Sequence, residues 1–268
     1  MLSVQEVYDI LHAGQAESTT LRRIWLRTAA GEDYPQEFDH FSFLTLAELA
    51  RARRQLRIDH RSTFGDLGCG TGGPGLWIVR ETGASVVGID ISRVAVARAA
   101  RRAAMLGFAG RARYHCVSLA STGLPDESLD AAASVDALVY VPDKLAALRE
   151  TARILRPGGR FVFTTFEIDP LQAAQLPAGV PQPVDDYRPL LHAAGFSIEV
   201  YEETPGWQER MRATHDELLS SRSTLIEELG ETAVKILLGE LSLAVERALC
   251  QRRVLGVAER RNAPRAPR

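Results

Sequence analysis

The run Asp66-Leu67-Gly68-Cys69-Gly70-Thr71-Gly72-Gly73 has the composition of a loop that binds a ligand through its main chain. It follows a short apolar stretch and opens a helical one, the place where doubly wound sheets bind nucleotides. Glycines there permit positive φ angles and let a ligand approach the backbone closely. Because Gly68, Gly70 and Gly73 also satisfy the dinucleotide fingerprint G-x-G-x-x-G, the glycines predict a nucleotide-like cofactor without selecting one.

Two carboxylates narrow the choice of cofactor. Asp66 precedes the first glycine, where it would lie beside the pyrophosphate of a dinucleotide, an unfavourable contact. S-adenosylmethionine carries an ammonium, a sulfonium and no phosphate, so the same acid favours it. Asp90 ends the apolar run VVGID about 20 residues past the glycines, where a carboxylate can accept both ribose hydroxyls. Alternatively, Asp90 caps the helix that begins near Ser92.

A third group of residues could move a proton. Asp136 and Glu167 follow the predicted fourth and fifth strands, at the ligand-binding edge of such a sheet, and His40 lies in an aromatic connector. A general base is needed only if an acceptor must lose a proton. Asp136, Glu167 and His40 are therefore the catalytic candidates. The sequence also offers Tyr140, a His192 expected to be structural, and His215.

The elements that must position these residues alternate between strand and helix. Apolar strand-like runs are separated by amphipathic helical segments from about residue 62, which predicts an α/β fold with a doubly wound, mostly parallel sheet. We expect an N-terminal helical segment or lid at 1–60, the cofactor-binding core at 61–206, and a helical cap at 207–250 interrupted near Gly230 and Gly239. The last strand of the core is expected at 251–261, and a disordered tail at 262–268.

Four motifs in order resemble those of the class I S-adenosylmethionine-dependent methyltransferases. They are DLGCGTGGPGLWIV, VVGIDIS, GLPDESLDAAASVDALVYVPD and RILRPGGRFVFTTFE, and together they cover about residues 62–170. The aromatic N-terminal segment and the helices before the last strand resemble the small-molecule branch found in bacterial secondary metabolism. The resemblance implies a Rossmann-like fold and S-adenosyl-L-methionine as the cofactor.

The resemblance also implies roles for individual residues. Gly68, Cys69 and Gly70 would face the cofactor through their backbone, and Asp66 would lie near its amino group. Asp90 would hold the ribose, and Ile91 would pack on the adenine. The adenine edge would meet Ser118, Leu119 and Ala120. The methionine end and the substrate entrance would be lined by Ser134, Val135 and Asp136. The family usually has an acid where this chain has Ser118, so the bond to the adenine amine is expected to be weaker.

Composition excludes several other classes of function. The net charge of −2 gives no global basic field for nucleic acid, and the arginine clusters have helical spacing. No apolar run reaches the roughly 20 residues that span a bilayer. The three cysteines are too scattered for a disulfide framework or zinc site, and no metal-ligand constellation is visible. A cytoplasmic protein with a small-molecule substrate is predicted, and its N-terminal or cap helices could mediate homo-oligomer contacts.

These observations predict methyl transfer to an O, N or C atom of a small, largely apolar acceptor by in-line displacement. Most of the rate would come from positioning the two reactants. Two alternatives remain at this point. One is a protein of the same fold that binds the cofactor but catalyses a non-methylating step such as cyclisation. The other is an NAD-dependent oxidoreductase, which Asp66 disfavours.

Overall fold

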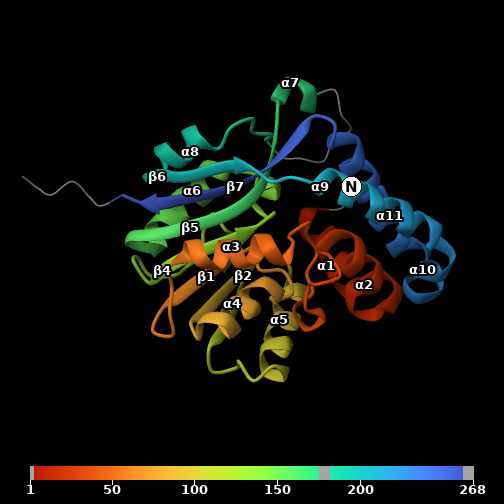
Figure 1. Ribbon diagram of the computed structural model, residues 1–268, viewed down its shortest axis with the longest axis horizontal. Helices are drawn as coiled ribbons and strands as arrows, with labels where there is room; N and C mark the ends of the chain where they lie inside the picture. Colours follow the sequence, from red (N-terminus) through yellow and green to blue (C-terminus); the bar gives the residue numbers. More distant parts are fainter. Residues whose placement is uncertain (1–2, 175–181, 262–268) are drawn as a thin grey trace, which may run out of the picture.

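A seven-stranded sheet in the order β3-β2-β1-β4-β5-β7-β6 forms the centre of the computed structural model, which describes residues 3–174 and 182–261 (Figure 1). The strands are β1 (Thr63–Leu67), β2 (Ser85–Asp90), β3 (Ala112–Cys116), β4 (Leu129–Val135), β5 (Leu155–Ile168), β6 (Phe196–Glu203) and β7 (Gln251–Arg260). All neighbouring strands are parallel except β7, which is antiparallel to both β5 and β6. The predicted α/β fold with a mostly parallel sheet is confirmed. The expected tail at 262–268 lies outside the described residues.

Helices cover both faces of the sheet because its central strands are apolar on both sides. In β4, Ala131 and Ala133 join the core on one face, and Ala132 joins the core on the other. The first face is covered by α3 (Leu46–Leu56), α4 (Gly73–Thr82) and α5 (Arg93–Met105), which lie in front of the sheet in Figure 1. The second face is covered by α6 (Lys144–Ile154) and the short α8 (Arg188–Ala193).

Side-chain caps fix where two of these helices begin. Thr45 and Glu48 form a capping box at the start of α3, as their spacing predicts. Ser92 caps α5 by accepting a hydrogen bond from the Ala95 N–H. Since α5 follows Asp90 by only two residues, this cap also fixes the chain beside the predicted ribose carboxylate.

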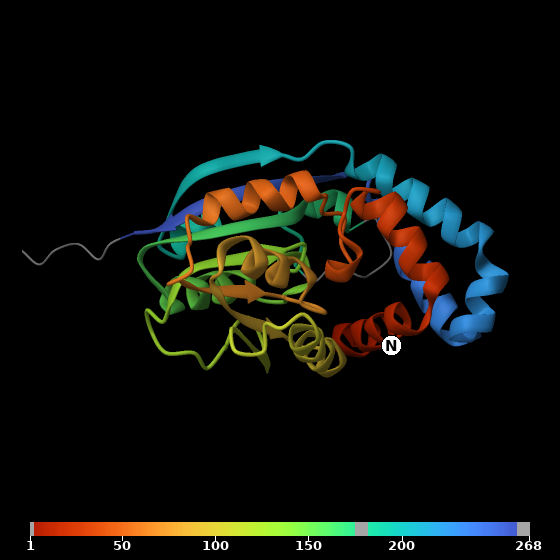
Figure 2. The same ribbon diagram turned by 60° about the horizontal axis from the view of Figure 1, so that its bottom comes forward.

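The N-terminal and cap helices pack on one another at one end of the sheet (Figure 2). The N-terminal group comprises α1 (Val4–Glu17), α2 (Thr19–Trp25), the π-helical turn η1 (Leu26–Ala30) and η2 (Gln36–Phe38). The cap group comprises α9 (Trp207–Ser220), α10 (Arg222–Leu229) and α11 (Glu231–Arg247). Two short elements, η3 (Leu138–Tyr140) and α7 (Pro170–Ala173), follow β4 and β5. The N-terminal segment and the segment between β6 and β7 are thus brought together at one end of the sheet, whereas β7 carries the chain back to the other end.

One expected boundary was wrong. The predicted interruption near Gly239 does not occur, because α11 continues through it, whereas Gly230 separates α10 from α11 with a φ of 80°. The strand β5 begins at Leu155, before the segment PGG, and the extra residues form an irregularity between the Leu129–Leu155 and Ala131–Arg160 pairs.

Candidate functional site

The glycine loop turns directly above the end of β1. Gly68 has a φ of 78°, and a Cβ atom there would come within 2.2 Å of the Ala137 Cβ. The N–H groups of Gly68 and Cys69 both donate to the Ile89 carbonyl, at 2.7 and 3.0 Å. These bonds tie the loop to the end of β2, so the backbone at Gly68 and Cys69 faces the same edge of the sheet as Asp90.

The carboxylate of Asp90 is held in place by main-chain N–H groups of the glycine loop and of the start of α5. Its Oδ2 accepts from the Gly70 N–H at 2.8 Å and its Oδ1 from the Ser92 N–H at 2.9 Å. Burial raises the pKa of this carboxyl, and the two backbone bonds act in the opposite direction. Each oxygen retains a second lone pair, so the fixed carboxylate can still accept two hydroxyl groups.

Asp66 is a buried acid with an unused oxygen. The residue is 3% exposed, and its Oδ2 has no hydrogen-bond partner among the described residues. Burial, and then the charge of Asp90, raise the pKa of Asp66 to about 7. A cation or a hydrogen-bond donor on a ligand would stabilise the ionised form of a carboxylate buried in this way. The ammonium of S-adenosylmethionine is such a cation, and a pyrophosphate would have the opposite effect.

The two acids line one end of a cavity of about 240 Å³ that crosses the carboxyl edge of the sheet. Ile91, Ser118 and Leu119 line the same end, whereas Ala120 is not among the lining residues that the structure describes. The Ser118 Oγ already accepts a bond from the Ala120 N–H at 3.2 Å. The Ser118 hydroxyl therefore keeps one donor and one lone pair for a ligand.

Ser134 does not reach this cavity. The residue is fully buried, and its Oγ donates to the Leu67 carbonyl at 2.7 Å, joining the ends of β4 and β1. Its predicted contact with the cofactor is therefore corrected. Successive strand residues point to opposite faces, so Val135 lines the cavity where Ser134 does not.

Asp136 lines the cavity with a strained backbone and a paired carboxylate. Its φ of 52° is rare outside glycine, and its Oδ1 accepts from the Arg253 Nε at 2.9 Å. Arg253 is fully buried and also donates to Glu48 at 2.8 Å. The Phe43 N–H reaches the other Asp136 oxygen at 3.4 Å. This network ties the connector before α3 to the end of β4, so Asp136 serves first to position other residues.

Glu167 faces away from the cavity. The sequence placed it just beyond a strand, but β5 continues to Ile168 and turns Phe166 toward the cavity and Glu167 to the opposite face. Its carboxylate accepts from Arg252 at 2.6 Å and from the Tyr187 N–H at 3.0 Å, and is bonded to the Tyr201 hydroxyl. The expectation that Glu167 acts in catalysis is therefore corrected: it cross-links β5, β6 and β7.

His40 is the catalytic candidate that lies in the cavity wall with a free ring nitrogen. Its Nδ1 accepts from the Ser42 N–H at 3.2 Å, so the proton of the neutral ring is on Nε2, which has no partner. Burial lowers the pKa of His40 to about 4. A neutral ring in this tautomer is a hydrogen-bond donor to a ligand rather than a base.

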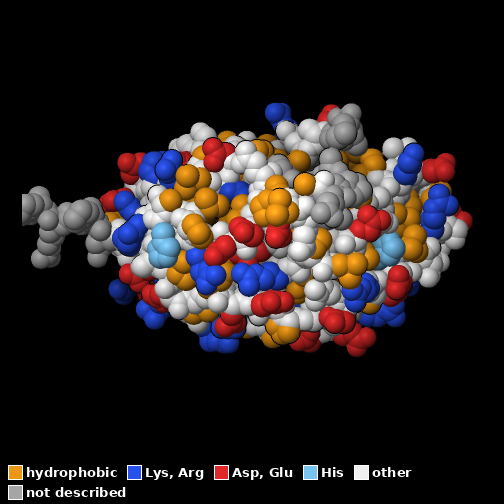
Figure 3. Space-filling view, turned by 90° about the horizontal axis from the view of Figure 1, so that it is seen from above, with side chains coloured by type: hydrophobic (Ala, Val, Ile, Leu, Met, Phe, Trp, Pro, Cys, Tyr) orange, Lys and Arg blue, Asp and Glu red, His pale blue; other side chains and the backbone are white. Residues whose placement is uncertain are grey.

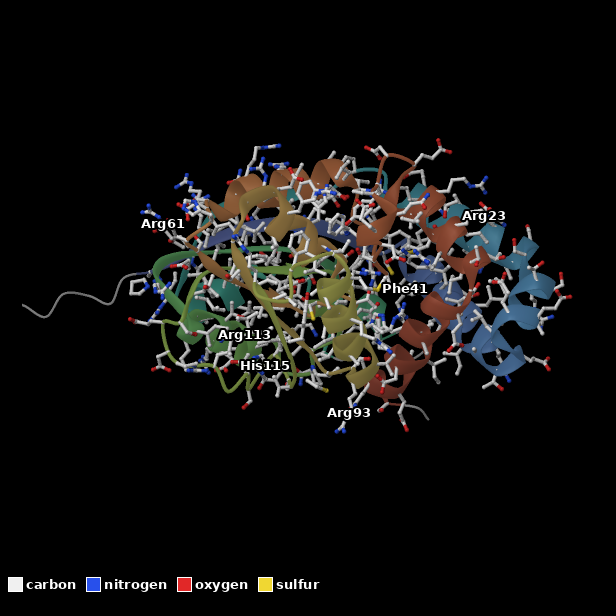
Figure 4. The ribbon with its side chains drawn as sticks, turned by 90° about the horizontal axis from the view of Figure 1, so that it is seen from below. Arg23, Phe41, Arg61, Arg93, Arg113 and His115 are labelled. Carbon is white, nitrogen blue, oxygen red and sulfur yellow. The ribbon has the colours of Figure 1, made fainter. Side chains whose placement is uncertain are left out.

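The aromatic connector divides between packing and the cavity. Tyr34 and Phe38 belong to the core under α4, whereas Phe41 and Phe43 line the cavity. Trp25 stacks on Phe41 with ring centroids 3.9 Å apart. In the view of Figure 4, Phe41 lies between the sheet and the terminal helices, whereas Arg61 lies at the edge of the molecule.

Several residues that line the cavity were not predicted from the sequence, because they lie far from the motifs, near the two ends of the sequence. Tyr8 and His12 of α1 and Arg247 of α11 line the cavity. Tyr140, which the sequence offered, lies there too and packs edge-on against the Tyr8 ring, with ring centroids 5.1 Å apart. His215, by contrast, bonds Ser242 at 2.9 Å, and His192 lies on α8 on the far face of the sheet. The three-to-four spacing of α1 indicated a buried face, and no signal indicated what it covers.

Comparison with known proteins identifies the family. Residues 65–163 match the model of a methyltransferase domain. Residues 65–163 are a class I S-adenosylmethionine-dependent methyltransferase domain. S-adenosylmethionine is the cofactor of this domain, in agreement with the unpartnered acid at Asp66.

The methyltransferase domain has curated relatives of partial coverage. The chain is 29% identical over 180 residues to methyltransferase GfsG of Streptomyces halstedii, which is 63% of this chain and 64% of that one. It is 30% identical over 158 residues to 27-O-demethylrifamycin SV methyltransferase of Amycolatopsis mediterranei, 53% of this chain and 58% of that one. The matches thus span about three fifths of the length of these two relatives.

Solved structures extend the likeness in fold to nearly the whole chain. The [4+2]-cyclase SpnF has a TM-score of 0.78 at 22% identity, covering 97% of this chain and 96% of its own. The cyclopropane synthase MmaA2 of Mycobacterium tuberculosis has a TM-score of 0.74 at 15% identity, covering 94% and 98%. At these identities the likeness shows the fold, including the terminal helices, and nothing further.

The described residues offer neither a metal site nor a membrane span. No group of three or more His, Cys, Asp or Glu in residues 3–174 and 182–261 is arranged to hold a metal ion. Among the same residues, no helix is both long and apolar enough to cross a bilayer.

Proposed function

We propose that this protein transfers the methyl group of S-adenosylmethionine to an O, N or C atom of a small, largely apolar molecule. The observation that carries the proposal is the continuity of one cavity from Asp66 and Asp90 to an apolar wall built by the terminal helices, the connector before α3 and the end of β5. That wall includes Trp25, Phe43 and Phe166. The bound cofactor supplies an electrophilic methyl group whose transfer leaves a neutral thioether.

The residues of this chain act mainly by holding and enclosing. Asp90 and the glycine loop are fixed to one another by the Gly70 N–H bond, which sets the ribose end of the cofactor. The aromatic wall excludes water and orients an apolar acceptor, and such positioning supplies much of the rate in a displacement of this kind. Since Asp136 is paired with Arg253 and His40 presents an N–H, we propose an acceptor that is already nucleophilic at neutral pH.

Other features of the molecule fit a small acceptor better than a nucleic acid. The face in Figure 3 intersperses acidic and basic side chains, and the chain has a net charge of −2. The first curated relatives are named as methyltransferases, one of them for a rifamycin compound. We therefore propose a place in bacterial secondary metabolism. Cytoplasmic location, a homo-oligomer through the terminal helices, and the division into lid, core, cap and last strand stay predictions.

A non-methylating reaction is the second candidate. Asp136 and His40 leave the acceptor end without an evident base, and an enclosed apolar cavity can also fold a flexible substrate for cyclisation. The SpnF likeness supports only the fold that such a protein would use.

The experiment is incubation of the purified protein with methyl-labelled S-adenosylmethionine and a panel of apolar alcohols, phenols, amines and polyketide-like compounds. Labelled product together with S-adenosylhomocysteine supports methyl transfer. A product of unchanged mass without S-adenosylhomocysteine supports cyclisation instead. Failure of S-adenosylmethionine and S-adenosylhomocysteine to bind in calorimetry would refute both.

A further inference from the structure

Arg247 is a buried cation in the wall of the cavity. It lies in the last turn of α11, is 7% exposed, and is the only Lys or Arg among the lining residues that the structure describes. Its Nη2 has no hydrogen-bond partner, and none of its guanidinium nitrogens pairs with a carboxylate in the described part of the chain. A guanidinium remains charged at any physiological pH, so its burial without a partner is costly.

The other charged residues of the cavity do not meet this need. Asp66 and Asp90 lie at the glycine loop, and Asp136 is paired with Arg253. Glu240 lines the cavity two turns before Arg247 on the same helix and forms no ion pair with it. No charged side chain that lines the cavity in residues 3–174 and 182–261 pairs with Arg247, which favours an anionic ligand as its partner.

The surroundings of Arg247 indicate the shape of that partner. Leu237, Leu241 and Ala244 also line the cavity and form one stripe along α11 that ends at Arg247. From Leu237 to Arg247 the stripe advances by ten residue steps, or about 15 Å of helix. Such a wall fits an apolar chain or ring system with an anionic oxygen group at one end.

Tyr140 lines the same cavity as this stripe and the glycine loop. It begins from the turn after β4, and its phenol is influenced by the charges of both Asp136 and Arg247. The neighbouring turn packs on the loop, since Ala137 blocks any Cβ at Gly68. Phe166 of β5 and Gln251 of β7 line the cavity too, and Gln251 follows Arg247 by four residues along the chain.

We propose that Arg247 binds a carboxylate on the methyl acceptor, so that the acceptor is an apolar molecule with an acidic end. The proposal rests on the proposed function, because it assigns the apolar end of the cavity to the acceptor. The carboxylate of S-adenosylmethionine is a second source of the same chemistry, and the experiment must separate the two.

The test is calorimetric titration of the full chain with octanoate, with its neutral isostere octanamide, and with S-adenosylhomocysteine. The variants are Arg247→Gln and, as a control on the same helix, Lys235→Gln, which removes an exposed cation outside the cavity. We expect Arg247→Gln to weaken octanoate binding by about tenfold or more through loss of a charge-assisted bond. Binding of octanamide and S-adenosylhomocysteine should not change, and Lys235→Gln should behave as the wild type.

Each contrary result overturns the proposal in a distinct way. Failure of the wild type to bind octanoate, or equal binding of octanoate and octanamide, excludes an anion site at Arg247. Weakened S-adenosylhomocysteine binding with octanoate unaffected assigns Arg247 to the cofactor. Arg247→Lys checks folding, because it keeps the charge and should retain part of the octanoate affinity. Wild-type binding of S-adenosylhomocysteine tests the proposed function separately from this inference.

Discussion

Replacing Asp66 with Asn should stabilise the free protein and weaken its binding of the cofactor. Burial raises the pKa of Asp66 from 3.8 to about 7, so the folded state binds a proton more tightly than the unfolded state. The free energy of unfolding therefore falls as the pH rises from about 4 to 7, and the loss is complete above pH 7. At 1.36 kcal/mol per pKa unit, the ionised acid costs about 4 kcal/mol.

Asparagine removes that cost but leaves an amide in the same apolar surroundings. An unsatisfied buried amide group costs about 1–3 kcal/mol, so the net gain at pH 8 should be about 1–3 kcal/mol. At pH 4 the variant should gain nothing, because the acid is protonated in the folded state. Urea unfolding at the two pH values measures the difference, and Asp33→Asn, at an exposed position, is the control.

The affinity for S-adenosylhomocysteine should rise with pH, in contrast to the stability of the free protein. The ammonium of S-adenosylhomocysteine favours the ionised acid, so its binding should weaken about tenfold when the pH is lowered from 8 to 6 and Asp66 takes up a proton. His12 and His40 do not contribute there, since burial lowers their pKa values to about 4. In Asp66→Asn the affinity should be lower at pH 8 and its pH dependence nearly flat. A variant that is less stable than wild type, or that keeps the slope, refutes this account.

Three further substitutions test the surrounding site. Gly68→Ala should lower both the free energy of unfolding and the affinity for S-adenosylhomocysteine, because the new Cβ meets Ala137. Gly107 has the same φ of 78° but open space around it, so Gly107→Ala should cost only the backbone strain of about 1–2 kcal/mol. Equal losses of stability in the two variants would contradict the role of the Ala137 contact. Arg253→Met should destabilise the fold by about 3–5 kcal/mol in chemical unfolding because Asp136 loses its buried partner. Glu167→Gln should lower the melting temperature and leave cofactor affinity and turnover of bound acceptor unchanged, and a selective loss of turnover would restore a catalytic role.

The cofactor half of the site could be predicted from the sequence because it is local. The glycine loop, Asp90 and Ser92 fall within 30 residues, and each strand end and helix start in that stretch has its own signal. Side-chain direction was harder to predict. Ser134 and Glu167 were assigned from their distance to a strand end, but the alternation of side chains along a strand decides which face they occupy.

The acceptor half could not be predicted because tertiary packing alone creates it. Tyr8 and Arg247 lie almost at opposite ends of the chain, and they share a cavity because α1 and α11 pack together above the sheet. Helical periodicity showed that each of these helices has a buried face. Nothing in that pattern distinguishes a face that covers another helix from one that covers a ligand.

The charged residues of the cavity favour ligand groups of opposite charge at its two ends. At the glycine loop an acid, Asp66, lacks a partner, which favours a cation; at the end of α11 a guanidinium, Arg247, lacks one, which favours an anion. Of the other charged lining residues, Asp136 is already neutralised by Arg253, and Glu240 is exposed to solvent. A cationic cofactor and an anionic acceptor would thus each enter in one orientation, and their reactive atoms would meet beside the apolar wall. Holding the two reactants in this orientation would accelerate the transfer by positioning alone, without a catalytic base.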